Sequence, residues 1–126
     1  FQVAATARLC IAQRLARRLC SQGRRPRKLE KPEAGAVGRP DAAGATVYEP
    51  GGCDHCNGRG YRGRIGLFEL LPIDEDLARV IVEGGNEGDI ARRAREKKIP
   101  GLRDDAAAKL LAGITSFDEI IAVSAW

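Results

Sequence analysis

The sequence predicts a mainly α-helical fold with a small cysteine knuckle and short β-strands near its centre. Aromatic residues form only 5% of the chain, and Ala, Leu and Ile supply most of the apolar side chains, which favours helices over sheets. Apolar residues also recur at helical spacing near both ends of the chain. Between these regions, a glycine-rich stretch with two closely spaced cysteines breaks the helical pattern.

The N-terminal part is predicted to contain one helix and then a linker. Residues 3–20 place Leu9, Leu15 and Leu19 near helical spacing, with arginines on the remaining surface. Residues 24–45 are rich in Arg, Lys, Pro, Gly and Ala without a period, which predicts a mobile loop. A structureless connection of this length is uncommon, so we expect its two ends to meet.

Two short strands are predicted on either side of the cysteine pair, and four short amphipathic helices follow. Residues 46–50 are the first strand candidate, and residues 64–73 are the second, with Leu67 and Phe68 on opposite faces. The expected N-caps of the later helices are Asp74, Asn86 and Ser116, with Glu119 completing a capping box, and the expected stops are Gly84, Pro100 and Gly113.

The net charge of +4 is concentrated in the first third of the chain. Nine basic residues precede position 32, against Glu30 as the single acid. Such a basic block is compatible with nucleic acid, an anionic membrane surface, a phosphate ligand or an acidic partner, and also with a solvated helix face. Charge alone does not decide among these functions.

The location of the protein is expected to be cytoplasmic. No apolar run approaches the length of a membrane span, and arginines interrupt the N-terminal apolar residues, unlike in a signal peptide. The chain begins at Phe1 rather than Met, so we expect a fragment or a processed piece. In this setting the four cysteines favour metal binding over disulfides.

Cys53 and Cys56 form a CxxC pair that predicts a metal half-site. Two thiolates at this spacing can hold one ion from a tight turn, and the glycines that follow let the backbone curl around it. Cys20, at the end of the predicted N-terminal helix, is the natural third ligand. Zinc is the expected ion because structural zinc sites are built from such thiolates.

The fourth ligand of a complete zinc site is not evident. Gly23 stands where a second CxxC would end. His55 lies between the knuckle cysteines and is expected to point away from the ion, and Cys10 would lie about 15 Å from Cys20 along a helix. The open alternatives are a three-thiolate zinc site, with or without water, a set of free thiols, and a redox-active CxxC pair.

Four blocks of the sequence together carry a family resemblance. They are IAQRLARRLC (11–20), GCDHCNGRGYRGRIGLFELLPIDEDL (52–77), EGDIARRAREKKIPGLRDDAAAKL (87–110) and GITSFDEIIAV (113–123). In order and spacing they resemble the C-terminal region of the GspE/PilB-type ATPases of type II secretion and type IV pilus assembly. CDHCNGRG also matches one zinc repeat of DnaJ-type co-chaperones, but the chain has a single copy and no HPD tripeptide.

The resemblance implies a C-terminal fragment of a RecA-like, P-loop ATPase. Residues 1–20 would be the closing helix of the core, residues 21–72 the metal-binding subdomain, and residues 73–126 a helical tail. The parent would be a homo-hexamer that uses ATP and Mg²⁺, peripheral at the inner membrane, with platform or secretion-apparatus proteins as partners. This chain has no G-x-x-x-x-G-K-[ST] phosphate loop, so we expect no catalytic residue in it and no ATP hydrolysis by it alone.

In the same resemblance, Arg62 and Arg64 are candidates for a nucleotide or subunit contact, and the zinc ligands would be Cys20, Cys53 and Cys56. The alternative is a zinc-ribbon-like nucleic-acid-binding module, in which Tyr61 and the arginines around it would form a stacking platform. The C-terminal helices are not basic overall, so nucleic acid is not the expected partner.

Overall fold

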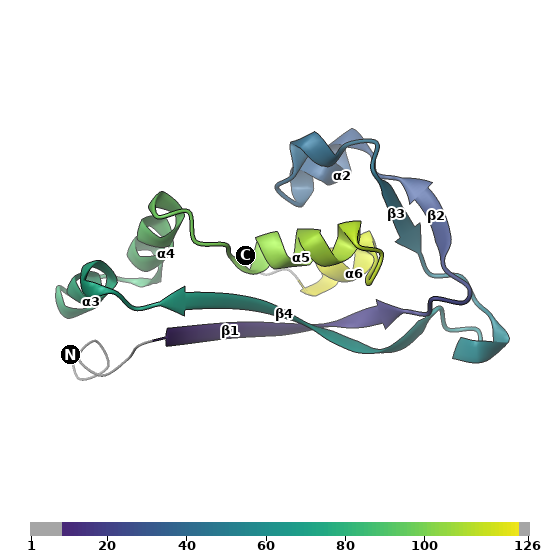
Figure 1. Ribbon diagram of the computed structural model, residues 1–126, viewed down its shortest axis with the longest axis horizontal. Helices are drawn as coiled ribbons and strands as arrows, with labels where there is room; N and C mark the ends of the chain where they lie inside the picture. The colour runs from purple at the N-terminus through teal and green to yellow at the C-terminus, as the bar shows by residue number, and fades with distance from the viewer. Residues whose placement is uncertain (1–8, 124–126) are drawn as a thin grey trace.

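The structure, a computed structural model, describes residues 9–123 and shows a mixed α/β fold rather than a mainly helical one. Within that range it contains five α-helices and two antiparallel sheets, each of two strands. Figure 1 shows a long ribbon formed by β1 and β4 that runs along the molecule. Helices α3 and α4 lie at one end, the cysteine knuckle lies at the other, and α5 and α6 lie along the middle.

Strand β1 (Leu9–Leu19) replaces the helix predicted over residues 3–20, and residues 3–8 lie outside the described part. It pairs along its length with β4 (Tyr61–Pro72), so the prediction was wrong for residues 9–19. The two faces of the strand differ where it crosses the core, since Ala16 is 1% exposed and its neighbour Leu15 is 48% exposed. Pairing with a distant strand outweighs the helical propensity of the Ala, Leu and Arg residues here.

The predicted linker over residues 24–45 is also wrong, because the segment is folded. It contains β2 (Arg25–Lys28), α2 (Lys31–Ala36) and the 3₁₀ turn η1 (Pro40–Ala42), and it leads into β3 (Thr46–Glu49). The expectation that its ends meet is confirmed, since β2 pairs antiparallel with β3. Its elements are too short to show a sequence period, but the segment from β2 to β3 buries five apolar residues. These are Leu29, Ala34, Val37, Ala42 and Val47.

The predicted β4 and the C-terminal helices are confirmed in outline. The helices are α3 (Glu75–Val82), α4 (Glu87–Glu96), α5 (Leu102–Leu111) and α6 (Phe117–Val123). Asp74 Oδ1 accepts the Leu77 N–H at 2.9 Å, and Asn86 Oδ1 accepts the Asp89 N–H at 2.9 Å, as expected of N-caps.

The capping box expected at α6 forms only in part. Ser116 Oγ accepts the Glu119 N–H at 3.2 Å. The Glu119 carboxylate turns to β1 instead, where it accepts the Arg17 backbone N–H at 2.8 Å and the Arg17 Nε–H at 3.1 Å. Glu119 therefore fixes α6 to the edge of the ribbon.

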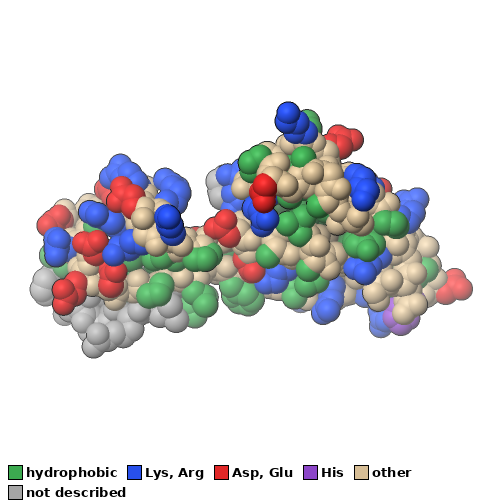
Figure 2. All heavy atoms as spheres, turned by 45° about the horizontal axis from the view of Figure 1, so that its top comes forward, with side chains coloured by type: hydrophobic (Ala, Val, Ile, Leu, Met, Phe, Trp, Pro, Cys, Tyr) green, Lys and Arg blue, Asp and Glu red, His purple; other side chains and the backbone are tan. Residues whose placement is uncertain are grey.

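The hydrophobic core lies between the ribbon, α5 and the folded segment of β2, α2 and β3. Its largest members are Leu29, Val47, Leu67, Leu110 and Ile120. Helices α3 and α4 lie apart from this core. An ion pair connects them, since Lys97 Nζ, at the end of α4, lies 2.7 Å from Asp74 Oδ2, at the start of α3. Figure 2 shows acidic and basic side chains intermingled at that end. No helix among the described residues is long and apolar enough to cross a membrane.

Candidate metal centre

The knuckle is a single tight turn between β3 and β4. Cys53 is the N-cap residue of the 3₁₀ turn η2 (Asp54–Cys56), and Cys56 is its last residue. The chain then curls back through residues with positive φ, among them Asn57 at 54° and Gly60 at 82°. A Cβ on Gly60 would lie 2.5 Å from the Pro50 Cβ, so only glycine fits this close approach.

Gly60 connects two of the cysteines through its backbone. Its N–H donates to Cys56 Sγ at 3.1 Å, and its carbonyl accepts the Cys20 N–H at 2.9 Å. The turn after the CxxC pair therefore places Cys20, at the end of β1, against the knuckle.

The structure brings the three predicted ligands together. The sulfur of Cys53 lies 3.6 Å from that of Cys20 and 3.5 Å from that of Cys56, and all three sulfurs lie within 4.8 Å of one another. A tetrahedral zinc ion with Zn–S bonds of about 2.3 Å separates its sulfurs by about 3.75 Å, whereas a disulfide joins them at about 2.05 Å. The cluster could therefore hold a metal ion, and its spacing is compatible with zinc.

The environment favours one thiolate in particular. Burial disfavours the charged form of Cys56, but the Gly60 N–H and the neighbouring cysteines outweigh it and lower the pKa from 9.0 to about 7. Burial raises the pKa of Cys53 instead. Cys20 and Cys56 are almost fully buried, at 2% and 3% exposed. The Cys56 thiol therefore ionises at a lower pH than the Cys53 thiol, and bound metal would stabilise both thiolates.

None of the proposed fourth ligands reaches the cluster. Gly23 packs against Gly51, so that a Cβ at position 23 would lie 2.4 Å from the Gly51 carbonyl oxygen and 3.2 Å from the Cys53 Cβ. His55 Nε2 contacts Arg62 Nη1 instead of the sulfurs. Cys10 lies on β1, where it pairs with Leu71 of β4, about 30 Å from Cys20 at the rise of a strand. The side chain of Cys10 lies outside what the structure describes.

Gly23 nevertheless stands beside the site, as its place three residues after Cys20 predicted. The close contact of the Gly23 and Gly51 backbones leaves no room for a Cβ, and so for a cysteine side chain, at position 23 without a shift of the backbone. The three cysteines Cys20, Cys53 and Cys56 are the group that the described residues offer to a metal ion.

The two candidate arginines occupy different places at the start of β4. Between them Gly63 has a φ of 71°, and the register shifts between Arg17 and Leu19 of β1. This bulge turns Arg62 towards His55, whereas Arg64 stands opposite Arg17.

Tyr61 is part of a structural network rather than an open stacking platform. Its hydroxyl lies 2.7 Å from Ser116 Oγ, and the Arg17 guanidinium lies 4.1 Å from its ring centroid. Sequence analysis missed this link between β4, β1 and α6. The Ser116–Glu119 spacing is the available signal in the sequence, but by itself it predicts a local helix cap. A ring that is already covered offers little to a nucleotide base, so the nucleic-acid alternative loses its main support.

Known proteins resemble this chain over almost its whole length. The family model described as "Type II/IV secretion system protein" matches residues 1–122. The chain is 44% identical over 114 residues to the type II secretion system protein E of Dickeya dadantii, covering 90% of this chain and 22% of that protein. It is 38% identical over 122 residues to the type IV pilus assembly ATPase PilB of Pseudomonas aeruginosa, covering 95% of this chain and 21% of that protein. The chain thus spans about a fifth of the length of the curated relatives it matches.

Proposed function

Because the chain belongs to the type II/IV secretion system protein family, we propose that it is the C-terminal part of a hexameric ATPase that powers type IV pilus assembly or type II protein secretion. The complete protein would bind ATP and Mg²⁺, in the cytoplasm and peripheral at the inner membrane, against platform or secretion-apparatus proteins. The chain itself has no phosphate loop and would not hydrolyse ATP alone, so its contribution to hydrolysis would be limited to an arginine contact. Its role would be to transmit motion to neighbouring subunits and membrane partners.

The meeting of three elements at the cysteine cluster supports this role most strongly. Cys20 follows β1, while Cys53 and Cys56 stand between β3 and β4. A bound zinc ion would supply a structural cross-link here and no chemistry of its own. The ribbon of β1 and β4 then extends about 35 Å towards α3 and α4, as 11 residues of paired strand do. A ribbon that is cross-linked at the cysteine cluster and packed along its length would transmit a displacement of the knuckle end to α3 and α4 at the other end.

Arg64 and Arg62 are the proposed contacts to a nucleotide or a neighbouring subunit. In the described range 9–123, neither arginine has a carboxylate at ion-pair distance, whereas Arg17, opposite Arg64, is bound to Glu119. Arginines near a subunit boundary stabilise phosphate charge in motors of this kind. An anionic group from outside the chain would complete the environment of Arg64.

The experiment compares the complete ATPase with its Cys53→Ser/Cys56→Ser and Arg64→Gln variants. We expect the double variant to lose zinc, hexamer stability and pilus extension or secretion. We expect Arg64→Gln to keep zinc and to lose at least tenfold in ATP hydrolysis, with Arg59→Gln as the charge-matched control. If hydrolysis and assembly are unchanged in the double variant and the wild type contains no zinc, the proposed role of the knuckle is wrong.

A further inference from the structure

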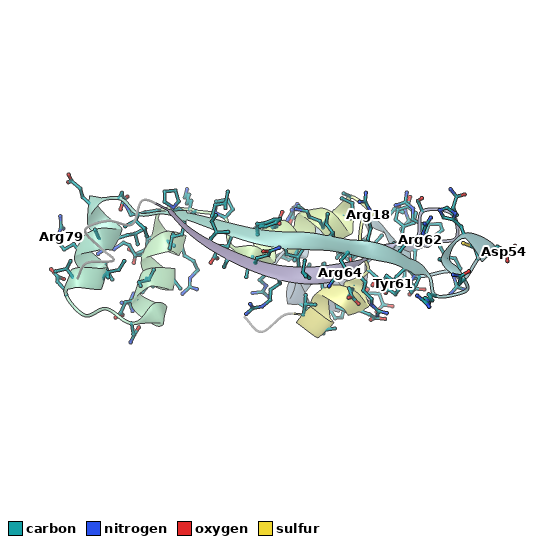
Figure 3. All side chains as sticks on the ribbon, turned by 90° about the horizontal axis from the view of Figure 1, so that it is seen from below. Arg18, Asp54, Tyr61, Arg62, Arg64 and Arg79 are labelled. Carbon is teal, nitrogen blue, oxygen red and sulfur yellow. The ribbon has the colours of Figure 1, made fainter. Side chains whose placement is uncertain are left out.

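A second feature of the knuckle end is a hollow with a basic lining. It has a volume of about 430 Å³ and is lined by Arg18, Leu19, Cys20, Ser21, His55, Arg62 and Gly63. The lining comes from the end of β1, from η2 and from the bulge of β4. Figure 3 shows Arg18 and Arg62 at the same end of the ribbon, with Asp54 beyond them at the tip of the molecule.

The arginines of this hollow have no carboxylate partner in the described part of the chain. No carboxylate lines it, and neither Arg18 nor Arg62 has a carboxylate at ion-pair distance within residues 9–123. Arg62 Nη1 instead contacts His55 Nε2, so the neighbour of this guanidinium is an imidazole, which carries no negative charge. Figure 2 shows the histidine side chain beside basic side chains at this end. Arg18 and Arg62 both line the hollow, so an anion bound between their guanidinium groups would offset the repulsion of the two positive charges.

The donors present match an oxyanion in number and kind. The two guanidinium groups offer forked N–H donors that fit phosphate oxygens in pairs. Ser21 adds a hydroxyl, which has no hydrogen-bond partner among the described residues. The hollow is also larger than one phosphate group, which leaves room for the group that carries it.

We infer that the hollow between Arg18, Arg62 and His55 binds a phosphate-bearing anion. This site is separate from Arg64, which lies on the other side of the bulge opposite Arg17. The inference gives Arg62 a ligand class and does not depend on ATP hydrolysis by the parent protein. The phosphate group is the shared chemistry of two sources, a small soluble phosphate compound and a lipid headgroup.

The first experiment titrates the 126-residue chain with inorganic pyrophosphate by calorimetry at low and at physiological salt. We expect binding that Arg18→Gln and Arg62→Gln each weaken at least tenfold, because each removes charge-assisted hydrogen bonds worth about 1.5 kcal/mol or more. Arg62→Lys should retain part of the binding, since it keeps the charge but loses the fork. Far-UV circular dichroism checks that each variant is folded.

Arg59→Gln is the matched control, because Arg59 lies in the same knuckle, carries the same charge and does not line the hollow. It should change pyrophosphate binding less than twofold. An equal loss in Arg59→Gln and Arg62→Gln would mean diffuse surface attraction and would overturn the inference.

The second experiment identifies the source of the phosphate group. Co-sedimentation with phosphatidylglycerol/phosphatidylcholine vesicles is compared with calorimetric titration of ADP, again with Arg18→Gln, Arg62→Gln and Arg59→Gln. A loss of vesicle binding or of ADP binding that is confined to Arg18→Gln and Arg62→Gln supports the site. A loss of vesicle binding identifies a lipid headgroup as the source, and a loss of ADP binding identifies a soluble phosphate compound. The inference is overturned if pyrophosphate, ADP and vesicles all fail to bind the wild type at low salt.

Discussion

Cys53→Ser is expected to remove a cross-link that stabilises the zinc-loaded chain by about 4 kcal/mol. Cys20 and Cys53 are 33 residues apart in sequence and their sulfurs are 3.6 Å apart in the fold. A link that closes a loop of this length removes about 12 cal/mol/K from the entropy of the unfolded chain, which is about 4 kcal/mol at 25 °C. A metal clip acts on the unfolded chain in the same way as a disulfide.

The assay is thermal unfolding of the chain with bound zinc and after treatment with a chelator. For a chain of 126 residues, 4 kcal/mol corresponds to a fall in the midpoint on the order of 10 °C. Cys53→Ser should start from the lower midpoint and show no response to the chelator. Cys10→Ser, on β1 far from the cluster, should keep the full response. A wild-type midpoint that the chelator does not move would refute the reasoning.

Three further changes test the packing around the site. Leu67→Ala on β4, where the side chain is fully buried between the ribbon and α5, should cost about 2–5 kcal/mol in urea unfolding. Glu119→Ala should cost about 1.5–3 kcal/mol in the same assay, because the Arg17 N–H at 2.8 Å loses its charged acceptor. The hydrogen-bonded Arg27 guanidinium holds the pKa of Glu33 below 4.5, so Glu33→Gln should be less stable than the wild type at pH 7 by about 1 kcal/mol. This advantage of the wild type is present above pH 4.5 and is lost as the pH falls through the lowered pKa.

Each of these expectations has a contrary result. A loss below 1 kcal/mol for Leu67→Ala would mean that the ribbon doesn't pack on α5 as described. Equal unfolding free energies for Glu119→Ala and the exposed neighbour variant Asp118→Ala would remove the proposed link between α6 and β1. A stability difference for Glu33→Gln that stays constant from pH 7 to pH 3 would exclude its ionic interaction with Arg27.

The sequence was a good guide where the structure is set by local signals. Asp74 and Asn86 cap their helices through side-chain bonds to residues three positions on, so their spacing was sufficient evidence. The grouping of Cys20 with the CxxC pair was also predictable, because a CxxC pair in a glycine-rich turn is typical of a zinc site, which needs further ligands from elsewhere in the chain.

The sequence was misleading where distant pairing decides the structure. Leu15 and Ala16 are compatible with a helix, and only the partner strand β4, some 50 residues later, selects the extended form. The bond from Glu119 to Arg17 spans 102 residues and left no local trace beyond a capping pattern. The sequence also gives no local sign that Arg18, His55 and Arg62 line one hollow, because their meeting depends on the bulge at Gly63.

X-ray absorption at the zinc edge of the purified chain tests most directly whether three thiolates hold a metal ion. Three sulfur neighbours at about 2.3 Å and one oxygen or nitrogen neighbour at about 2.0 Å are expected, at one zinc per chain. Cys20, Cys53 and Cys56 supply the sulfurs, so Cys20→Ser should lower the sulfur count or release the metal. A wild-type chain that takes up no zinc, or zinc bound without sulfur neighbours, would contradict a metal centre at this cluster.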